Sequence, residues 1–450
     1  MDMRVTANVS TPSLEADTLA PMLQLVVDVR GGLPRMRQRS QTYLPAYSNE
    51  TREDYRRRVN LAPWRAEFAD ALRTLSSRPF EKPVTLGPDA PEPIIRFADD
   101  VDGRGSNLHT FARGFFEAAV ADGVSIILID APKADREIRT VADEKAAGIC
   151  PYWSVYPASS IISLRMERIG PKKEIVEARL RERIVEPDGD FGEKEIVQVR
   201  RLTPGAWEVW RESKPGQWEV FDSGAISNAA PQVGVNAVLL RTGEPAGDWS
   251  CRPPLLDLAY LQVELWKALS NLAEVLEYSA SPMLVAKNVG QLDGNGVKIG
   301  PRACLVCGEN GDWKYIQPEP RNIREIREHA KDVVADMQRL AMQPALVRPG
   351  ATATEVGLQA AKAHSALEAW ALGLKDALQT ALQKTIPFLL HDDRRDVGSW
   401  APVVNIHQDF GSEIGRNDEA RIIVDSAKIG LLSEGIARAE LLRRGLLQTV

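Results

Sequence analysis

The sequence predicts an α+β protein that folds into two or three packed units, and three observations predict it. Its 450 residues, 44% of them hydrophobic, exceed what one hydrophobic core holds. A helix-like segment at 107–121 leads into an apolar, β-branched run at 124–130, and residues 152–221 hold short strand-like runs between turn signals. Residues 253–391, in contrast, have helical spacing over most of their length.

The composition narrows the classes of function. A net charge of −6 argues against a basic surface that grips nucleic acid by neutralising its phosphates. Four cysteines in so long a chain cannot form a disulfide framework, so we expect a reducing compartment. The longest aliphatic run, 124–129, falls far below the ~20 residues that span a bilayer, and residues 1–19 lack the apolar core of a signal peptide. We expect no membrane partner and a mobile N-terminal arm.

The first third of the chain predicts helices followed by one buried strand. Helical spacing at 51–75 breaks at Pro63, and the arginines of this segment are expected to form a solvated face. Repeated prolines at 79–93 indicate a non-helical connector. Gly123 is expected to end the helix at 107–121, and the run that follows has the composition of a buried central strand.

Residues 152–221 predict an antiparallel sheet. Charged and apolar residues alternate within the runs, as a half-solvated sheet requires. The turn signals between the runs are Gly170-Pro171, Pro187-Asp188-Gly189 and Pro204-Gly205. Glycine, proline, serine and asparagine are frequent at 222–252, which predicts a break between domains.

The segment 253–391 predicts a helix, a β excursion, a second helix, a loop and a long third helix. Pro253-Pro254 can open the first helix, whose leucines recur every three or four residues through Tyr278. Short apolar runs at 283–286 and 303–306, separated by glycines, predict hairpin-like strands. The second helix is expected at 322–341, the loop at 343–353 and the third helix from Thr354 to residue 390.

The second helix has a narrow apolar stripe between charged flanks. The stripe consists of Ile323, Ile326, Ala330, Val333, Met337 and Leu340. This pattern is too polar for the core of a single chain. We therefore expect it to pack against neighbouring helices, including copies of itself in other subunits.

Motifs that could carry chemistry favour structural roles. Cys304-x-x-Cys307 has the spacing of a zinc half-site or a redox pair, but no second Cys or His pair lies near it. The five histidines are scattered, and Gly103-x-Gly105 lacks the third glycine of a dinucleotide-binding loop. The charge run 391–396 is typical of a solvated helix end. Three tryptophans are expected in a core or an interface, with ligand stacking as the alternative: Trp207, Trp210 and Trp218. We expect no catalytic residue, metal or cofactor.

Short matches in a fixed order along most of the chain carry a resemblance to a known family. They are Tyr43-Leu44-Pro45 with Tyr55-Arg56, Asp102-Gly103 with Phe111, Ser125–Asp130 with Ala131-Pro132, Pro151-Tyr152-Trp153 with Ile161-Ile162, Pro253–Ala259, Ser281-Pro282, Ile299-Gly300 and Ala353-Thr354-Glu355. On these residues the chain resembles the portal proteins of tailed bacteriophages. The resemblance is to a portal-like group known as a domain of unknown function in phage and prophage genomes.

The resemblance implies a portal-like fold with an α/β wing, a two-helix stem, a small β/α clip, a tunnel loop and a long helix leading to a helical crown. By this resemblance the parts of the chain are an N-terminal arm at 1–40, the wing at 41–252, the first stem helix at 253–280, the clip at 281–320, the second stem helix at 321–342, the tunnel loop at 343–353, the long helix at 354–391 and a C-terminal wing or crown region at 392–450.

The resemblance also implies a function without catalysis. It implies a dodecameric ring at one capsid vertex, through which double-stranded DNA passes during packaging and ejection. The implied partners are the large terminase subunit, a head–tail adaptor, and the major capsid and scaffolding proteins. The implied location is the virion, after assembly in the bacterial cytoplasm. A channel wall of acidic or mixed charge agrees with the net charge of −6, because many lysines and arginines would trap the phosphates.

Two sets of site residues follow from these assignments. The candidate channel-lining residues are Arg324, Arg327, Lys331, Gln343 and Arg348. The candidate partner-binding residues of the clip are Lys287, Asn288, Asp293, Lys298 and Trp313, chosen because they are polar or aromatic residues of the predicted excursion.

Two hypotheses from other classes stay open. A non-portal oligomeric virion or scaffolding protein would share the apolar stripes but lack an axial channel. A hydrolase with an α/β core around 124–130 and a helical cap would need a converging catalytic set, and the sequence shows none.

Overall fold

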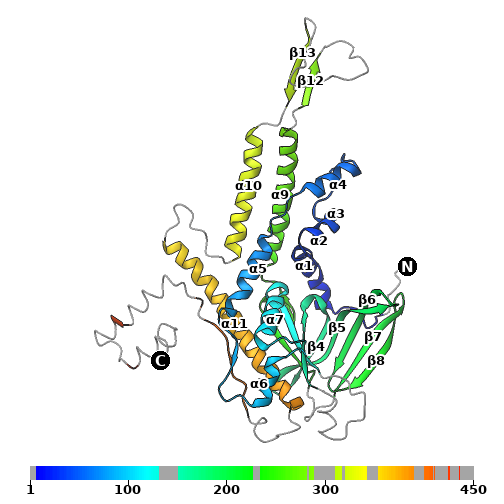
Figure 1. The fold of residues 1–450 in the computed structure, drawn as a ribbon, viewed down its shortest axis with the longest axis vertical. Coiled ribbons are helices and arrows are strands. Elements are labelled where there is room, and N and C mark those ends of the chain that lie inside the picture. Colours follow the sequence, from blue (N-terminus) through cyan, green and yellow to red (C-terminus); the bar gives the residue numbers. More distant parts are fainter. Residues whose placement is uncertain are drawn as a thin grey trace. The chain divides into compact units, whose positions relative to one another are not determined.

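The computed structural model describes residues 7–130, 150–226, 234–280, 283–287, 310–316, 320–341, 353–389, 400–408, 410, 424–425 and 435. It has the predicted mixed α+β composition, with several separate sheets (Figure 1). The chain divides into two compact units, each assembled from distant segments. The first, here called the sheet unit, comprises residues 1–27, 70–256 and 341–450. The second, here called the helical unit, comprises residues 28–69 and 257–340.

The helices are α1 Leu14–Arg30, α2 Gly32–Gln38, α3 Ser40–Tyr43, α4 Arg52–Leu61, α5 Glu67–Ser77, η1 Arg78–Phe80, α6 Glu92–Asp99, α7 Leu108–Asp122, η2 Ala158–Ser160, α9 Leu256–Ala280, α10 Pro320–Leu340 and α11 Ala353–Leu389. The strands are β1 Thr85–Leu86, β2 Val124–Asp130, β3 Tyr152–Pro157, β4 Ile161–Ile169, β5 Lys172–Asp188, β6 Gly192–Thr203, β7 Ala206–Lys214, β8 Gln217–Ala225, β9 Ala237–Arg241, β10 Glu244–Pro245, β11 Cys251–Arg252, β12 Met283–Lys287, β13 Asp312–Ile316 and β14 Val404–Asn405.

Two antiparallel sheets form the body of the sheet unit. The smaller has the strand order β3-β2-β9, and the larger has the order β4-β5-β6-β7-β8. The predicted turns at 170–171 and 204–205 are confirmed between β4 and β5 and between β6 and β7, whereas the turn predicted at 187–189 lies at 189–191, between β5 and β6. Gly170, Gly189 and Gly205 all have positive φ, which side chains other than glycine rarely adopt.

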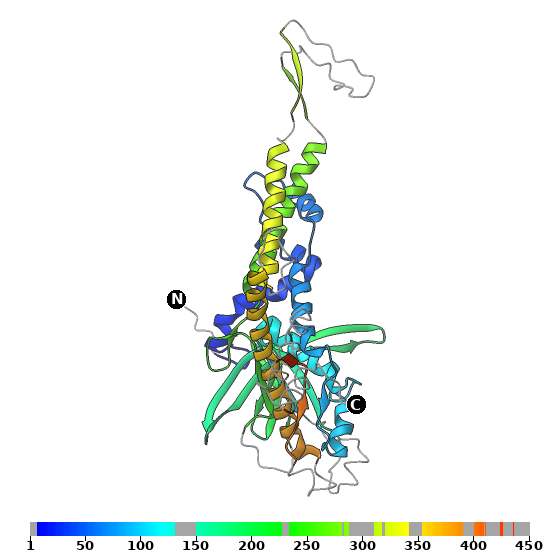
Figure 2. The same cartoon turned by 90° about the vertical axis from the view of Figure 1, so that its left-hand side faces the viewer.

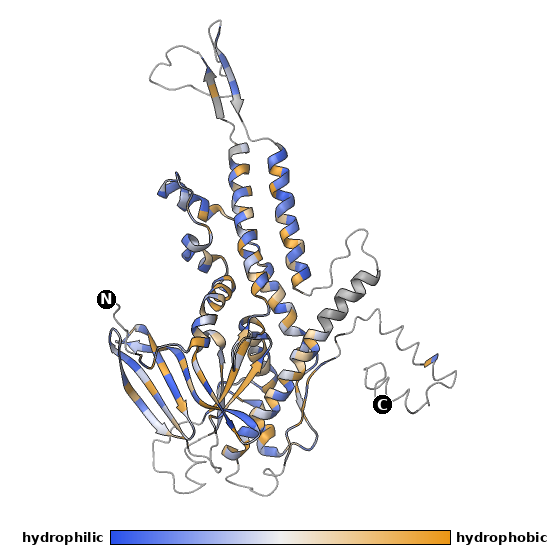
Figure 3. Ribbon diagram, turned by 180° about the vertical axis from the view of Figure 1, so that it is seen from behind, coloured by the Kyte–Doolittle hydropathy of each residue, from blue (hydrophilic) through white to orange (hydrophobic). Residues whose placement is uncertain are grey.

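β2 is the predicted buried central strand, and all seven of its residues are buried. Val124, Ile126 and Leu128 face a core that includes residues of the five-stranded sheet and of α1. On the other face, Ser125 Oγ donates to the Phe115 carbonyl of α7 at 3.0 Å, and α7 and α11 both pack on the strand. A strand covered on both faces has no solvent side, which explains its continuous apolar run. Figure 3 shows this hydrophobic concentration on the sheet.

The helix before β2 begins and ends at residues suited to those positions. The Asn107 side chain accepts a hydrogen bond from the Thr110 backbone N–H at 2.9 Å and so caps α7. Gly123 ends α7 with φ 83°, as predicted. A Cβ at position 123 would lie 3.0 Å from the Cys251 carbonyl oxygen and 3.1 Å from that of Arg252.

The expectation of a mobile arm at residues 1–19 is wrong for residues 14–19, which begin α1. Leu19 and Leu23 are buried in the core of the sheet unit. The sequence of this segment did not predict an ordered helix, because its hydrophobicity is only moderate. Packing against β2 and the larger sheet stabilises the helix. Residues 28–69 belong to the helical unit, and the division of the N-terminal part into arm and wing stays a prediction.

Residues 222–252, predicted as a break between domains, belong to the sheet unit, and the chain passes to the helical unit after Leu256. β8 extends to Ala225, β9 pairs with β2, and Trp249 and Cys251 lie in the core of the sheet unit. The strand β9 has only five residues, so its small apolar run is masked by the glycine-rich and proline-rich sequence around it.

The helical unit contains α9 and α10, which lie side by side and are connected through the β12–β13 hairpin (Figures 1 and 2). α9 has 25 residues and is therefore about 37 Å long. The hairpin pairs 283–287 with 312–316, whereas the predicted second strand at 303–306 lies outside the described residues. Most of the predicted C-terminal region, 392–450, is also outside them.

The segment from Tyr47 to Phe68 lies along α9. The Tyr47 hydroxyl donates to Asn271 Oδ1 at 3.0 Å. The Gln262 side chain donates to the Arg65 carbonyl at 2.7 Å and accepts from the Phe68 N–H at 3.0 Å. The expected break at Pro63 is confirmed between α4 and α5. The expected solvated arginine face is wrong for one residue of α4, because Arg58 is buried and paired with Glu50.

No helix among the described residues is long and apolar enough to cross a membrane.

Candidate functional site

The predicted channel-lining residues that the structure describes lie on one face of α10. Arg324, Arg327 and Lys331 are exposed, and their spacing of three and four residues places them in one row along the helix. Within the described part of the chain, none of the three forms an ion pair. Gln343 and Arg348 lie outside the described residues. Channel lining by these five residues stays a prediction.

The apolar stripe of α10 is divided between a buried and an unburied half. Ala330, Val333 and Met337 are buried within this one chain. Ile323 and Ile326, nearer the N-terminus of the helix, remain half-exposed. The expectation that α10 is too polar for a single chain's core is therefore wrong for its second half, because α10 lies beside α9 there (Figure 1).

The ends of α9 and α10 nearest the hairpin lack buried side chains. Among the described side chains, none from Asn271 to Ala280 of α9 and none from Arg321 to His329 of α10 is buried. Leu276 is 40% exposed, and Leu272 is half-buried. The single chain thus leaves apolar and charged surface uncovered over these two helix ends.

Two predicted clip residues lie on the β12–β13 hairpin. Lys287 ends β12 and is exposed, and Trp313 lies on β13 and is half-buried. The register pairs Lys287 with Asp312 and Ala286 with Trp313, so the two predicted residues lie on adjacent rungs. Asn288, Asp293 and Lys298 lie outside the described residues.

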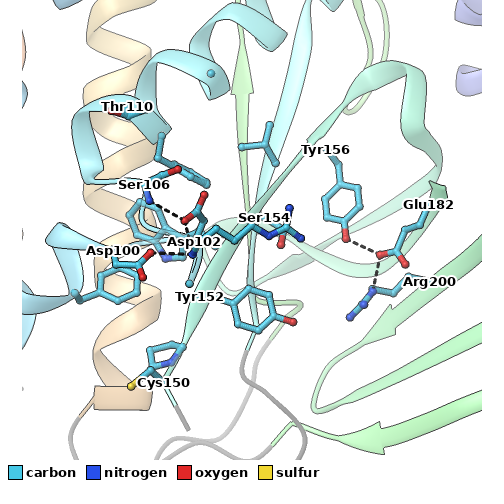
Figure 4. Close-up of a pocket in the computed structure, with 18 of the residues that line it drawn as sticks. Asp100, Asp102, Ser106, Thr110, Cys150, Tyr152, Ser154, Tyr156, Glu182 and Arg200 are labelled. Atoms are coloured by element: carbon cyan, nitrogen blue, oxygen red, sulfur yellow. Dashed lines mark hydrogen bonds and ion pairs between the residues drawn. The ribbon is translucent and has the colours of Figure 1, made fainter. Parts of the chain in front are cut away.

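The sheet unit contains a pocket that the sequence interpretation missed. Its volume is ≈ 1490 Å³, and its lining comes from the loop after α6, from α7, and from β3, β5 and β6 (Figure 4). Asp102 shapes the loop by accepting hydrogen bonds from the N–H groups of Arg104 at 2.9 Å and Ser106 at 3.1 Å. Burial raises the pKa of Asp102, but hydrogen bonds with the Ser106 side chain and with the N–H groups of Arg104 and Ser106 outweigh burial and hold the pKa below its usual value.

A network of charged and polar side chains lines the β3, β5 and β6 side of this pocket. Arg200 donates to Asp130 at 2.8 Å and to Glu182 at 2.7 Å. Tyr156 donates to Glu182 at 2.6 Å (Figure 4). Tyr152 donates to Asp130 at 3.3 Å. The network connects β2 and β3 of the smaller sheet to β5 and β6 of the larger one.

The two tyrosines of the network stay protonated at neutral pH. Burial, and then the charge of Asp130, raise the pKa of Tyr152 to about 12. Burial and Glu182 raise the pKa of Tyr156 well above its ordinary value. Both hydroxyls therefore act as donors to carboxylates, and the network has the partners expected of a structural contact between sheets.

The pocket gives no support to the hydrolase hypothesis. Its described lining includes three serines and Cys150 but no histidine or lysine. Across the described residues, no group of three or more His, Cys, Asp or Glu side chains could hold a metal ion. His109 accepts from the Val84 N–H at 3.2 Å, and His407 lies 3.4 Å from Glu81, so neither joins the pocket.

The other motifs singled out in the sequence are three tryptophans, a cysteine pair and a charge run. Trp207, Trp210 and Trp218 are half-buried on β7 and β8, and Trp207 packs against the core of the sheet unit. Cys304, Cys307 and the charge run 391–396 lie outside the described residues.

Comparisons with known proteins bear on the segment from α9 to α11. The family model described as "Domain of unknown function (DUF4055)" matches residues 254–389, which is less than half of the chain. This match confirms, over those residues, the resemblance to a phage-associated family of unknown function. No curated protein matches the chain.

Solved structures of a gene transfer agent (GTA) particle also resemble the chain weakly. A chain in the neck of the empty GTA particle, computed with C6 symmetry, is 13% identical, with a TM-score of 0.44 over 86% of this chain and 91% of that one. A chain in the virion of the native particle is 12% identical, with a TM-score of 0.43 over 87% and 94%. A chain in the native neck, computed with C12 symmetry, is 13% identical, with a TM-score of 0.42 over 83% and 89%. At this level of similarity, no property of that particle is transferred to this chain.

Proposed function

We propose that this protein is a structural protein of a phage-like virion and, more specifically, a portal subunit that forms a ring around a DNA channel at the capsid vertex. The observation that carries the proposal is the order α9, β12–β13, α10, α11, in a segment that matches a phage-associated family of unknown function. The portal resemblance of the sequence assigns stem, clip, stem and long helix to these elements in that order.

The uncovered surface of α9 and α10 supports an assembly of several copies. Side chains near the hairpin end of both helices include apolar residues that the single chain leaves half-exposed, such as Leu276 and Ile323. Leu272 and Leu276 share a face of α9, as Ile323 and Ile326 share a face of α10, and a partner would bury these side chains. Neighbouring subunits in a ring would bury them, because each subunit would place its helical pair against the next one.

The charge of the chain suits a conduit for DNA. α10 carries basic and acidic side chains in similar number along one exposed helix, and the whole chain has a net charge of −6. A wall of mixed charge lets a duplex slide, because few counterions are released at any one position. We propose that α10 and the segment 343–353 line this channel.

The β12–β13 hairpin is our proposed docking point for the packaging motor and the head–tail adaptor. Lys287 and Trp313 occupy adjacent rungs of this hairpin, so they present a cation and an aromatic ring on its two opposite faces. By the same proposal, the capsid and scaffolding proteins would contact the sheet unit.

Electron microscopy of the purified protein in negative stain tests the ring. We expect rings with a central hole, and the number of subunits follows from the images. Closed assemblies without a hole would support the non-portal virion or scaffolding protein instead. A monomer at every concentration, both alone and co-expressed with its capsid proteins, would contradict the proposal.

Deleting residues 344–352 tests the channel at a finer level. If this segment contacts DNA, capsids that carry the deletion assemble but fail to fill or to retain their DNA. Normal filling and retention of DNA would show that the tunnel-loop assignment is wrong, while the ring itself would stand.

A further inference from the structure

α10 carries three separate stripes of side chains. Members of each stripe are three or four residues apart, so they share a face of the helix. The apolar stripe is Ile323, Ile326, Ala330, Val333 and Met337; the basic stripe is Arg324, Arg327 and Lys331; the acidic stripe is Glu325, Glu328, Asp332 and Asp336. Successive residues are rotated by about 100° around the helix. The basic and acidic stripes therefore lie on opposite flanks of the apolar stripe.

The burial of these stripes shows which of them is available to a partner. Ala330, Val333 and Met337 are buried, so the apolar stripe faces the protein's own chain over its second half. The three basic side chains and the first three acidic ones are exposed, and Asp336 is half-exposed. Both charged flanks are thus available along the length of α10.

Among the described residues, two of the four acidic side chains have an ion-pair partner and none of the three basic ones does. Glu325 accepts from Arg321 at 2.8 Å, and Asp336 lies 3.2 Å from Arg339. Across the described residues, no ion pair joins the basic flank to the acidic one.

Like charges follow one another along each flank. Arg327 and Lys331 are four residues apart, as are Glu328 and Asp332, and like charges at this spacing destabilise an isolated helix, whereas Arg324 and Glu328, also four apart, attract each other. A partner with the opposite flank would relieve this repulsion. Such a partner is a second copy of the same helix, because each α10 carries a flank of either sign.

We propose that the basic stripe of α10 in one subunit docks on the acidic stripe of α10 in the next subunit. This inference rests on the ring proposed above and specifies its contact. The contact uses two different surfaces of each copy, so every added copy leaves one basic and one acidic flank free until the ring closes. In place of the channel lining predicted from the sequence, it assigns Arg324, Arg327 and Lys331 to the boundary between subunits, where they meet carboxylates instead of DNA phosphates.

Charge reversal of each flank separately tests the contact. The first variant, Arg324→Glu/Arg327→Glu/Lys331→Glu, has two acidic flanks, and the second, Glu328→Lys/Asp332→Lys/Asp336→Lys, has two basic flanks. Each variant alone would place like charges against each other. We expect the fraction of subunits in rings, measured by light scattering and negative stain, to fall by on the order of tenfold or more in each case.

An equimolar mixture of the two variants provides the decisive measurement. A basic-flanked chain then meets an acidic-flanked chain on either side, and an even-numbered ring closes with the two chains alternating. We expect rings to return in the mixture, with a one-to-one composition by native mass spectrometry. The control Arg324→Lys/Arg327→Lys keeps the charges and should form rings as the original protein does.

Each other outcome bears on a specific claim. The contact is wrong if either reversed variant forms rings alone. It is also wrong if the mixture stays unassembled although both variants retain their helical circular dichroism. In both cases the ring proposal stands. Normal rings of the first variant that fail to retain DNA would assign the basic stripe to the channel.

Should a triple variant lose helicity, Arg327→Gln/Lys331→Gln replaces it, with a partial loss of rings expected. If the original protein forms no ring, the proposed function fails and this contact falls with it.

Discussion

Arg58 shows how one buried charge depends on its partners. Its side chain is 5% exposed, and its Nε and Nη2 atoms donate to the two carboxylate oxygens of Glu50 at 2.7 and 2.8 Å. Nη2 also donates to the Pro45 carbonyl at 2.9 Å, and the guanidinium lies 4.3 Å from the centre of the Tyr47 ring. The sequence placed this arginine among exposed neighbours, because its run of arginines contains no signal that one of them faces inward.

Replacing Glu50 should destabilise the helical unit. Glu50→Gln leaves the Arg58 charge buried without its carboxylate, which we expect to cost roughly 3–5 kcal/mol. The hydrogen bonds from Arg58 hold the pKa of Glu50 below its usual value of 4.5. The stabilisation is therefore complete above about pH 4.5 and is lost as the pH falls through the lower pKa of the folded state.

Urea unfolding at neutral and acidic pH measures this effect. The free energy of unfolding should differ between the original protein and Glu50→Gln near neutral pH, and the two should converge in acid. Arg57→Gln is the control, because Arg57 pairs with Glu277 at the exposed surface and such pairs contribute under about 1 kcal/mol. Equal losses in both variants would show that burial does not decide the contribution.

Two neighbouring arginines on β6 provide a second matched pair. Arg200 is 20% exposed and pairs with Asp130 and Glu182, whose side chains are 7% and 10% exposed. Arg201 points to the other face and is 37% exposed beside Glu177 and Glu208. Arg200→Gln leaves two carboxylates without their cation, so we expect a loss of roughly 3–5 kcal/mol, against about 1 kcal/mol or less for Arg201→Gln. Thermal unfolding of the two variants measures the difference, and a larger loss for Arg201→Gln would contradict the structural role of the pocket network.

At the scale of elements, Gly123 connects α7 to β2 under two constraints, a positive φ and a lack of space for a side chain. The residue has φ 83°, and a side chain there would also press on the backbone carbonyls of β11. Gly205, in the turn between β6 and β7, has φ 76°, and a Cβ added there would have no neighbouring atom within 4 Å. The two glycines share the backbone conformation and differ in the space around it.

Alanine substitution separates these two constraints. Gly205→Ala should cost about 1 kcal/mol, from the positive φ alone. Gly123→Ala adds the close approach to Cys251 and Arg252, so its loss should exceed that of Gly205→Ala by on the order of 1–2 kcal/mol. Chemical denaturation of both variants gives the comparison. Equal losses would mean that β11 moves away at no cost.

The elements that the sequence predicted well are those with local signals. α7 was predicted from its spacing and Gly123, the turns of the larger sheet from their glycines and prolines, and α10 from its stripes. Strand pairing had no such signal. β9 joins β2, and β13 joins β12, through partners that periodicity does not specify.

At the scale of the whole molecule, the N-terminal helix is part of the sheet unit's core. Leu19 is 2% exposed, whereas Leu14 on the same helix is 83% exposed. Leu19→Ala should lower the free energy of unfolding by about 2–5 kcal/mol, because it leaves a cavity between α1 and the sheets. Leu14→Ala should change it by less than about 0.5 kcal/mol. Equal effects, measured by thermal or urea unfolding, would restore the hypothesis of a mobile arm.

The sequence by itself determined the α+β class, the buried strand β2, the turns of the larger sheet, and the helices α9, α10 and α11. It could do so because glycine conformations, proline positions and helical spacing act within a few residues. It also singled out Arg324, Arg327 and Lys331 as candidate functional residues of α10, although their role stays a prediction.

Only the tertiary structure decided which distant segments meet. The Trp153 indole donates to Thr385 at 2.8 Å across 232 residues, and Arg200 reaches Asp130 across 70. The same long-range packing buries Arg58, brings α1 into the core and assembles each unit from separate stretches of chain. The physical reason is that the burial of a side chain depends on the segments that pack against it. A local sequence pattern shows only which side chains are apolar enough to be buried.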